Sequence, residues 1–218
     1  MKLLITLLIL LYSSCACSAI QIERSRVIYS GDHKSAALEI HNESKDNYIV
    51  QSWLDDDAGK SEKTMVVTPP LLKLLPDQSA TLRFVYSGSG LPADRESVIW
   101  INVQEIPPRA KEPNVMQLAV RTRLKLFYRP VALRTTLKEE VQKLKINALH
   151  DGIVINNNGP MHISLGQLTI RNASGKEQTI SAPMISPFSQ ANIPFPKGSR
   201  VVSLTYINDY GGVENLNL

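Results

Sequence analysis

Residues 114–130 read NVMQLAVRTRLKLFYRP. Apolar and polar residues alternate along this segment as they do in a β-strand, and the segment is longer than the strands that a domain of this size normally contains. The apolar residues Met116, Leu118, Val120, Leu124 and Leu126 share one face, and Gln117, Arg121, Arg123, Lys125 and Arg129 share the other. Such a strand spans on the order of 40 Å at about 3.3 Å per residue, against about 5 to 6 residues for a usual strand. We therefore expect part of this segment to serve something other than its own sheet.

Shorter alternating runs precede this segment and are separated by turn residues. They cover residues 21–29, 36–41, 48–54, 79–86 and 97–106, with breaks at Gly31-Asp32, 42–47, Pro69-Pro70, 87–90 and Pro107-Pro108. This spacing is typical of a β-sandwich rather than of alternating strands and helices. About seven strands fit before residue 130, which predicts a first domain over residues 20–134.

A second set of short alternating runs follows and predicts a smaller β-sandwich over residues 135–218. The runs cover residues 141–146, 152–156, 162–170, 178–180, 191–193 and 201–207. Residues 137–149 are ambiguous, because Leu137, Val141, Leu144 and Ala148 also suit one face of a helix. We predict a strand there, since residues 143–147 alternate cleanly.

The first nineteen residues have the composition of a secretory signal peptide. Lys2 precedes an unbroken apolar run and then small residues, so cleavage is expected after Ala19. Both cysteines, Cys15 and Cys17, would leave with the signal, and the mature chain would then contain no disulfide and no cysteine metal site. No later segment approaches the roughly 20 apolar residues that a membrane span requires, so we expect an exported protein without membrane insertion.

Motifs for catalysis, metals and nucleotides are missing from the sequence. The histidines His33, His41, His150 and His162 lack metal-ligand spacing, and residues 55–57, three aspartates, lack the downstream residues of a calcium loop. The net charge of +4 accompanies no nucleic-acid motif. We therefore expect no metal, no cofactor and no nucleic-acid partner, and a binding protein rather than an enzyme.

Five motifs in a fixed order then point to one family. They are residues 25–29 (SRVIY), 68–70 (TPP), 92–109 (PADRESVIWINVQEIPPR), 125–130 (KLFYRP) and 206–212 (YINDYGG). Behind a signal peptide, this series resembles the periplasmic chaperones of the chaperone–usher pathway, which assemble pili on Gram-negative bacteria. The resemblance implies an all-β protein of two immunoglobulin-like sandwiches, arranged as a boomerang with a cleft between them.

The same resemblance implies a use for the long alternating segment. Such chaperones lend their seventh strand to a pilus subunit that lacks its own last strand. The lent part falls on residues 114–120, with Met116, Leu118 and Val120 as the inserted side chains and Leu124 as a further candidate. By sequence pattern alone, these residues would instead cover the chain's own core, as most alternating strands do.

The resemblance also implies roles for two sets of charged residues. Arg26 and Lys125 match the cleft cations that grip the C-terminal carboxylate of a bound subunit. Glu96, Arg129 and Asp209 match an ion network that ties the two domains together. The residue types suit both tasks, because the guanidinium of Arg129 can donate hydrogen bonds to two carboxylates at a domain boundary.

Partners and subclass follow from the resemblance as well. The expected partners are pilus subunits and an outer-membrane usher, and the short connection over residues 107–113 resembles that of chaperones for rod-like pili. Met161 and His162 stand where many members have paired aromatics, and the disulfide near the C-terminus of some members is missing. An exposed apolar edge also predicts self-association when no subunit is bound.

Two other functions compete with the chaperone. A secreted adhesin or receptor ectodomain would use the same sandwich architecture but would place its binding residues in loops at one end. A hydrolase would require a pocket with converging titratable groups, and the sequence assembles none.

Overall fold

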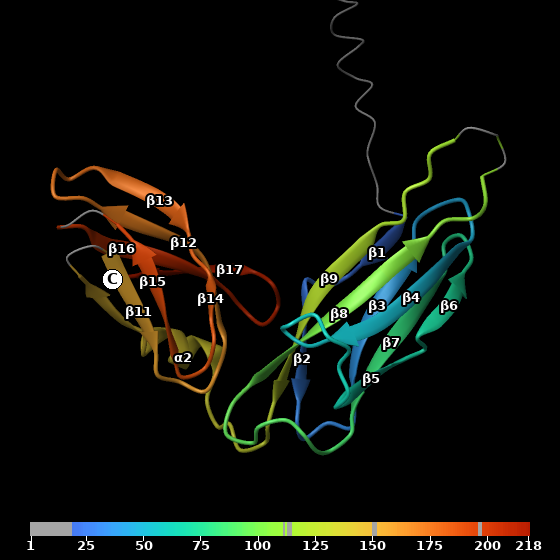
Figure 1. Ribbon diagram of the computed structural model, residues 1–218, viewed down its shortest axis with the longest axis horizontal. Helices are drawn as coiled ribbons and strands as arrows, with labels where there is room; N and C mark the ends of the chain where they lie inside the picture. Colours follow the sequence, from blue (N-terminus) through green and yellow to red (C-terminus); the bar gives the residue numbers. More distant parts are fainter. Residues whose placement is uncertain (1–18, 111, 113–114, 150–151, 196–197) are drawn as a thin grey trace, which may run out of the picture.

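The computed structural model describes residues 19–110, 112, 115–149, 152–195 and 198–218. The predicted signal peptide lies almost entirely outside the described residues, as do Asn114 and His150. Two lobes built of strands meet at one end of the molecule and diverge toward the other (Figure 1). No described helix is long and apolar enough to cross a membrane.

The first lobe is a sandwich of two sheets. One sheet has the order β1-β3-β7-β5 and the other β2-β9-β8-β4-β6. The strands are β1 (Ile20–Ile22), β2 (Arg26–Ser30), β3 (Ala36–Asn42), β4 (Tyr48–Asp55), β5 (Met65–Thr68), β6 (Leu71–Leu74), β7 (Ser79–Tyr86), β8 (Ser97–Ile106) and β9 (Arg121–Arg129). Leu38, Ile40, Leu82, Phe84 and Leu126 are among the side chains buried between the sheets.

Two sequence predictions for this lobe need correction. The run predicted over residues 21–29 is two strands, because the chain pairs first with β3 in one sheet and then with β9 in the other. The predicted long strand is also shorter, since β9 begins at Arg121 and residues 115–120 form no strand. Alternation alone could not show this, because extended residues need a neighbouring chain to form a ladder.

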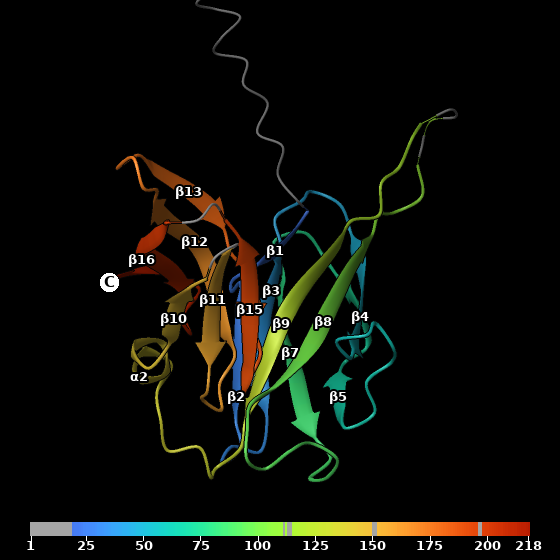
Figure 2. The same ribbon diagram turned by 60° about the vertical axis from the view of Figure 1, so that its left-hand side comes forward.

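The second lobe is a smaller sandwich. One sheet has the order β10-β11-β15, whose strands lie side by side in Figure 2, and the other has the order β13-β12-β16-β17 with β14 beside β12. The strands are β10 (Lys145–Ala148), β11 (Gly152–Asn157), β12 (Ile163–Arg171), β13 (Glu177–Ser181), β14 (Met184–Ile185), β15 (Ser189–Pro194), β16 (Arg200–Ile207) and β17 (Val213–Asn217). Ile155, Met161, Ile163, Leu168 and Leu204 form part of its core.

The start of the second lobe corrects the strand predicted near residue 141. Helix α2 (Leu137–Gln142) comes first, and the strand β10 begins only at Lys145. A capping box explains the helix: the Thr136 side chain accepts from the Glu139 N–H, and the Glu139 carboxylate accepts from the Thr136 N–H. The sequence therefore contained a signal for the start of a helix at Thr136. The prediction of a strand relied on the alternation of residues 143–147 instead.

Candidate functional site

One edge of β9 is only partly covered. Strand β2 pairs with β9 in parallel, and the pairing begins at Arg26 opposite Lys125 and ends at Ser30 opposite Arg129. On the same side of β9, no described strand pairs with residues 121–124. The backbone of this stretch is therefore an open sheet edge that ends where β2 begins.

Arg26 stands at the end of the open edge. It is 8% exposed, and its Nη1 donates a hydrogen bond of 3.1 Å to the carbonyl of Ile207 in the second lobe. Burial lowers the pKa of Arg26, although the charges of Asp209 and Glu96 act in the opposite direction. Its Nε is buried without a hydrogen-bond partner. The guanidinium is thus partly desolvated and incompletely hydrogen-bonded, so an anion beside it would stabilise its charge.

Lys125 lies beside Arg26 on the same face of the sheet. Burial lowers the pKa of Lys125, and the positive charge of Arg26 lowers it further. Within the described part of the chain, neither cation forms an ion pair. Two partly desolvated like charges side by side are costly, and an anion placed between them would relieve that cost.

The segment that precedes β9 presents its apolar side chains to solvent. Val115 is 54% exposed, Met116 85%, Leu118 74% and Val120 45%. Leu124 behaves differently: it is 8% exposed and packs in the core of the first lobe. The expectation that Leu124 is a further inserted residue is therefore wrong, because its side chain is already used by its own sandwich.

Arg129 joins the two lobes at the far end of β9. Its Nε donates to Glu96 Oε1 at 2.7 Å, and its Nη1 and Nη2 donate to the two carboxylate oxygens of Asp209 at 2.6 Å each. Burial acts to lower the pKa of Arg129, but hydrogen bonds to Asp209 and the charge of Glu96 outweigh it and raise the pKa. The structure thus brings together all three residues that the family resemblance associated.

His162 is a fourth residue at this junction, and the sequence analysis gave it no role. Its backbone N–H and its ring Nδ1 lie 2.8 and 3.1 Å from Glu96 Oε2, and the Glu96 N–H donates to the Pro160 carbonyl at 2.8 Å. A carboxylate only accepts, so Nδ1 carries the proton of this bond. The departure from the family pattern at residue 162 indicated that this position differs from that of many relatives, but the sequence could not show that its side chain faces Glu96.

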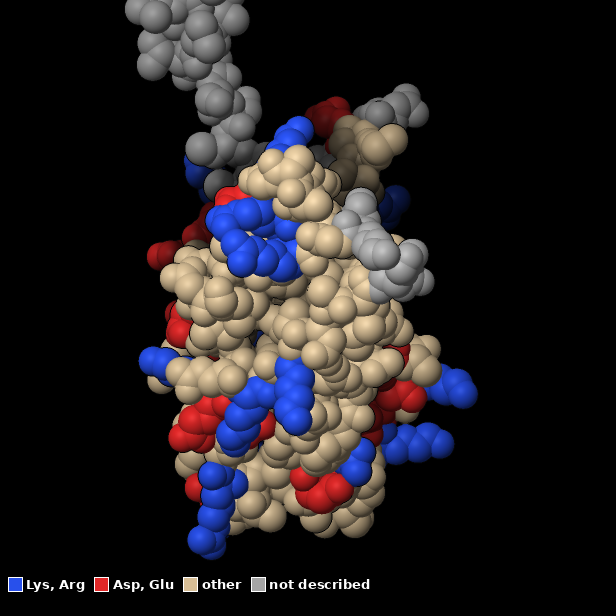
Figure 3. Space-filling model, turned by 90° about the vertical axis from the view of Figure 1, so that its left-hand side faces the viewer, with Lys and Arg blue, Asp and Glu red and all other residues tan. Residues whose placement is uncertain are grey.

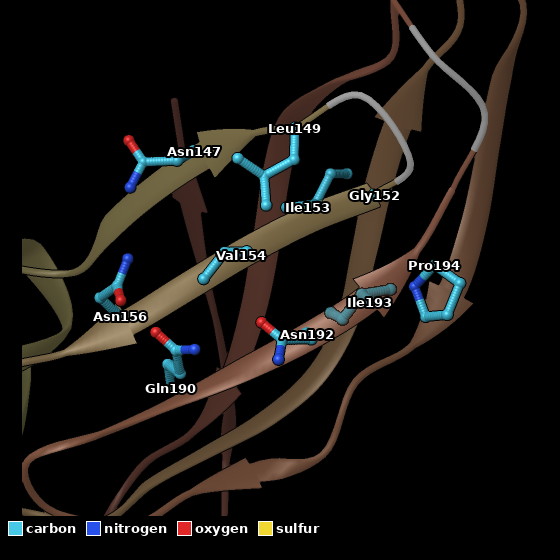
Figure 4. A pocket seen from close by; sticks show the side chains of 10 residues that line it. All are labelled: Asn147, Leu149, Gly152, Ile153, Val154, Asn156, Gln190, Asn192, Ile193 and Pro194. Carbon is cyan, nitrogen blue, oxygen red and sulfur yellow. The ribbon is translucent and has the colours of Figure 1, made fainter.

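A hollow elsewhere in the second lobe has a different character. It measures about 680 Å³ and lies over strands β10, β11 and β15 (Figure 4). Its lining is uncharged and consists of Asn147, Leu149, Gly152, Ile153, Val154, Asn156, Gln190, Asn192, Ile193 and Pro194. Seen from this end of the molecule, basic residues gather above a broad uncharged centre, and basic and acidic residues lie together below it (Figure 3). The converging titratable groups that a hydrolase requires are not found in this hollow.

Comparison with known proteins identifies the family. Residues 19–134 match the model described as the pili and flagellar-assembly chaperone PapD N-terminal domain, and residues 139–218 match the pili assembly chaperone PapD C-terminal domain. The chain belongs to the pilus assembly chaperones. This membership favours the chaperone reading over the adhesin reading, which the fold alone could not separate.

Relatives in this chaperone family match over nearly their whole length. The chaperone protein PapD of Escherichia coli is 34% identical over 217 residues, which cover 97% of this chain and 90% of PapD. The chaperone protein LpfB of Salmonella typhimurium is 37% identical over 200 residues, which cover 88% of this chain and 84% of LpfB.

Solved chaperone structures confirm the predicted all-β fold of two sandwiches. The E. coli chaperone DraB is 33% identical with a TM-score of 0.78, covering 91% of this chain and 95% of DraB. The Pseudomonas aeruginosa chaperone CupB2 is 28% identical with a TM-score of 0.79, covering 90% of this chain and 98% of CupB2.

Proposed function

We propose that this chaperone receives the last strand of a pilus subunit on the open edge of β9 and holds its terminal carboxylate between Arg26 and Lys125. The observation that carries the proposal is the coincidence of two features. The open edge ends where β2 begins, and the two partly buried cations without an ion pair lie at that point. A strand that fills the edge must stop there, so its carboxylate meets the cations.

The direction of the bound strand follows from the pairing of β2. Strand β2 starts at Arg26 and runs parallel to β9. A subunit strand that lies on the open edge and ends at Arg26 points in the same direction as β2, so it also runs parallel to β9. Charge-assisted hydrogen bonds to the carboxylate, each of roughly 1.5 to 3 kcal/mol, would fix the register of the ladder.

The exposed segment before β9 supplies the second half of the interaction. In the proposal, Met116, Leu118 and Val120 fill the groove of a subunit that lacks its last strand. Burying each side chain would contribute about 1.5 to 3 kcal/mol. The subunit is capped in this way until an outer-membrane usher receives it, and no cofactor takes part.

The junction at Arg129 has a structural role in this proposal. Glu96, Arg129 and Asp209 hold the second lobe against the end of β9, so that the carbonyl of Ile207 stays beside Arg26. The chaperone acts in the periplasm after cleavage following Ala19. Without a subunit, it self-associates through the exposed segment, which light scattering of the subunit-free protein would detect.

Substitution of each cation tests the carboxylate site. Arg26→Ala and Lys125→Ala should abolish co-purification of subunits from periplasmic extracts, while circular dichroism and urea unfolding show an intact fold. Arg83→Ala is the matched control, because Arg83 is an exposed arginine on β7 in the other sheet. Recovery of subunit complexes at the control level by both cleft variants would overturn the proposal.

A further inference from the structure

Beyond the carboxylate site, the outer face of β9 continues as a row of cations. Arg121, Arg123 and Lys125 are two residues apart and so point to the same side of the sheet. Arg121 and Arg123 are exposed, and none of the three forms an ion pair within the described residues. We call these three residues the β9 basic row.

Tryptophan rings support the β9 basic row. The Arg123 Cζ lies 4.1 Å from the ring centroid of Trp100, and the Arg121 Cζ lies 5.9 Å from that of Trp53. The Lys125 Nζ lies 5.4 Å from the Trp100 centroid. Cations stacked on rings lose less conformational freedom when they bind an acidic group than cations that extend freely into water.

Two aspartates on the same face already accept hydrogen bonds, although the charge of Asp57 still acts to raise the pKa of Lys125. Asp55 on β4 accepts a hydrogen bond from Asn102 at 2.8 Å, and Asp57 accepts one from the Trp100 indole at 3.0 Å. In the sheet order, β8 separates β4 from β9. A strand that docks on the open edge therefore meets the basic row before it meets either aspartate.

We propose that the β9 basic row selects subunits with acidic side chains at alternate positions within their last five residues. This inference rests on the proposed function, because the terminal carboxylate at Arg26 and Lys125 sets the register. A strand parallel to β9 then places the residues of one face beside Arg123 and Arg121. Acidic residues on that face gain two partners, whereas basic residues meet like charges.

Synthetic peptides of about ten residues, long enough to lie beside residues 115–124, test the inference. Each has an alternating Val/Thr sequence and a free C-terminal carboxylate. Two peptides carry Glu at either the second and fourth or the third and fifth positions from the C-terminus, and two carry Lys at the same positions. Binding to the full-length chaperone is measured by calorimetry at low and high salt, since salt screens exposed charges.

In one of the two arrangements, the Glu peptide should bind about tenfold more tightly than its Lys counterpart at low salt, and less so at high salt. The double substitution Arg121→Gln with Arg123→Gln should remove the difference, while Arg83→Gln should retain it. Equal binding of Glu and Lys peptides in both arrangements would overturn the inference.

An amidated form of the better Glu peptide separates the two proposals. If amidation weakens binding but Glu and Lys peptides bind alike, the carboxylate site stands and the basic row selects nothing. If amidation has no effect, or if no peptide binds, the proposed function fails and the inference fails with it.

Discussion

The two ends of β9 differ in how completely their polar groups are paired. At the Arg129 end, β2 and β8 flank the strand, and one guanidinium bonds two carboxylates from both lobes. At the Arg121 end, one edge is open, and Arg121 and Arg123 lie over tryptophan rings without an ion pair among the described residues. The same strand is thus paired on both edges at one end and has an open edge at the other. In the proposed function, the paired end holds Arg26 and Lys125 in place, and the carboxylate of a subunit pairs with them.

The largest expected effect distinguishes the exposed segment from the strand that follows it. Leu124→Asp should unfold the first lobe, because a charge placed in its core costs more than about 4 kcal/mol. Leu118→Asp should change the free energy of unfolding by no more than about 0.5 kcal/mol. Urea denaturation measures both, and co-purification should show that Leu118→Asp no longer captures subunits. Unfolding of the Leu118→Asp protein would mean that this side chain belongs to the core.

The next largest effect is expected at the ion network of Glu96, Arg129 and Asp209. Arg129→Ala leaves Glu96 buried with one partner fewer, and we expect a loss of about 3 to 5 kcal/mol in the free energy of unfolding. Arg171→Ala is the matched control, because its pair with Glu177 is much more exposed than the junction and should contribute no more than about 1 kcal/mol. Equal losses in the two variants would show that the junction is no stronger than a surface pair.

A smaller effect is expected at His162. Replacement by Phe keeps a ring beside Phe127 but removes the donor to Glu96, which should cost about 1 to 3 kcal/mol. His162→Asn places an amide donor near the position of Nδ1 and should recover part of that loss. The control is His41→Phe, since His41 pairs with an exposed Asp77 far from the junction. If the Phe and Asn variants lose equal stability, the ring bond contributes nothing.

The smallest expected effect is a change in the pKa of Lys125 when a carboxylate binds. Burial and Arg26 lower the pKa of Lys125 from its usual 10.5, and a bound carboxylate favours the charged form and should raise it. Binding therefore takes up protons at pH values between the lowered pKa of the free protein and the higher pKa of the complex, and affinity falls as the pH rises through the pKa of the free protein. NMR titration of the Lys125 side chain with a carboxylate peptide would show the shift. An amidated peptide should leave the pKa unchanged, and a shift with both peptides would contradict a carboxylate cause.

Sequence patterns predicted the strands that are long and half-buried. The boundaries of β7 and β8 coincide with their alternating runs, because one face of each strand meets the core and the other meets solvent or a polar neighbour. The short strands β5 and β6 escaped prediction, since four residues on either side of Pro69-Pro70 give too little alternation. Helix α2 was missed because its capping box precedes only six helical residues.

For the site, the family motifs led to Arg26, Lys125 and the three residues of the junction. The motifs did not show how deeply these side chains are buried or which groups they bond. Only the structure shows that Arg26 is buried with an unpartnered Nε and that His162 bonds Glu96 from the other lobe. Those facts depend on contacts between residues far apart in the chain. No local pattern encodes them.

By itself, the sequence determined two β-sandwiches and an alternating segment too long for one of them, because side-chain alternation is a local property of extended chains. The tertiary structure decided where that segment divides. Leu124 enters the core and Leu118 does not, since β8 continues beside β9 from Arg121 while residues 115–120 form no strand. The start of β2 at Arg26 then sets the end of the open edge, because a sheet edge is open only where no neighbouring strand covers it.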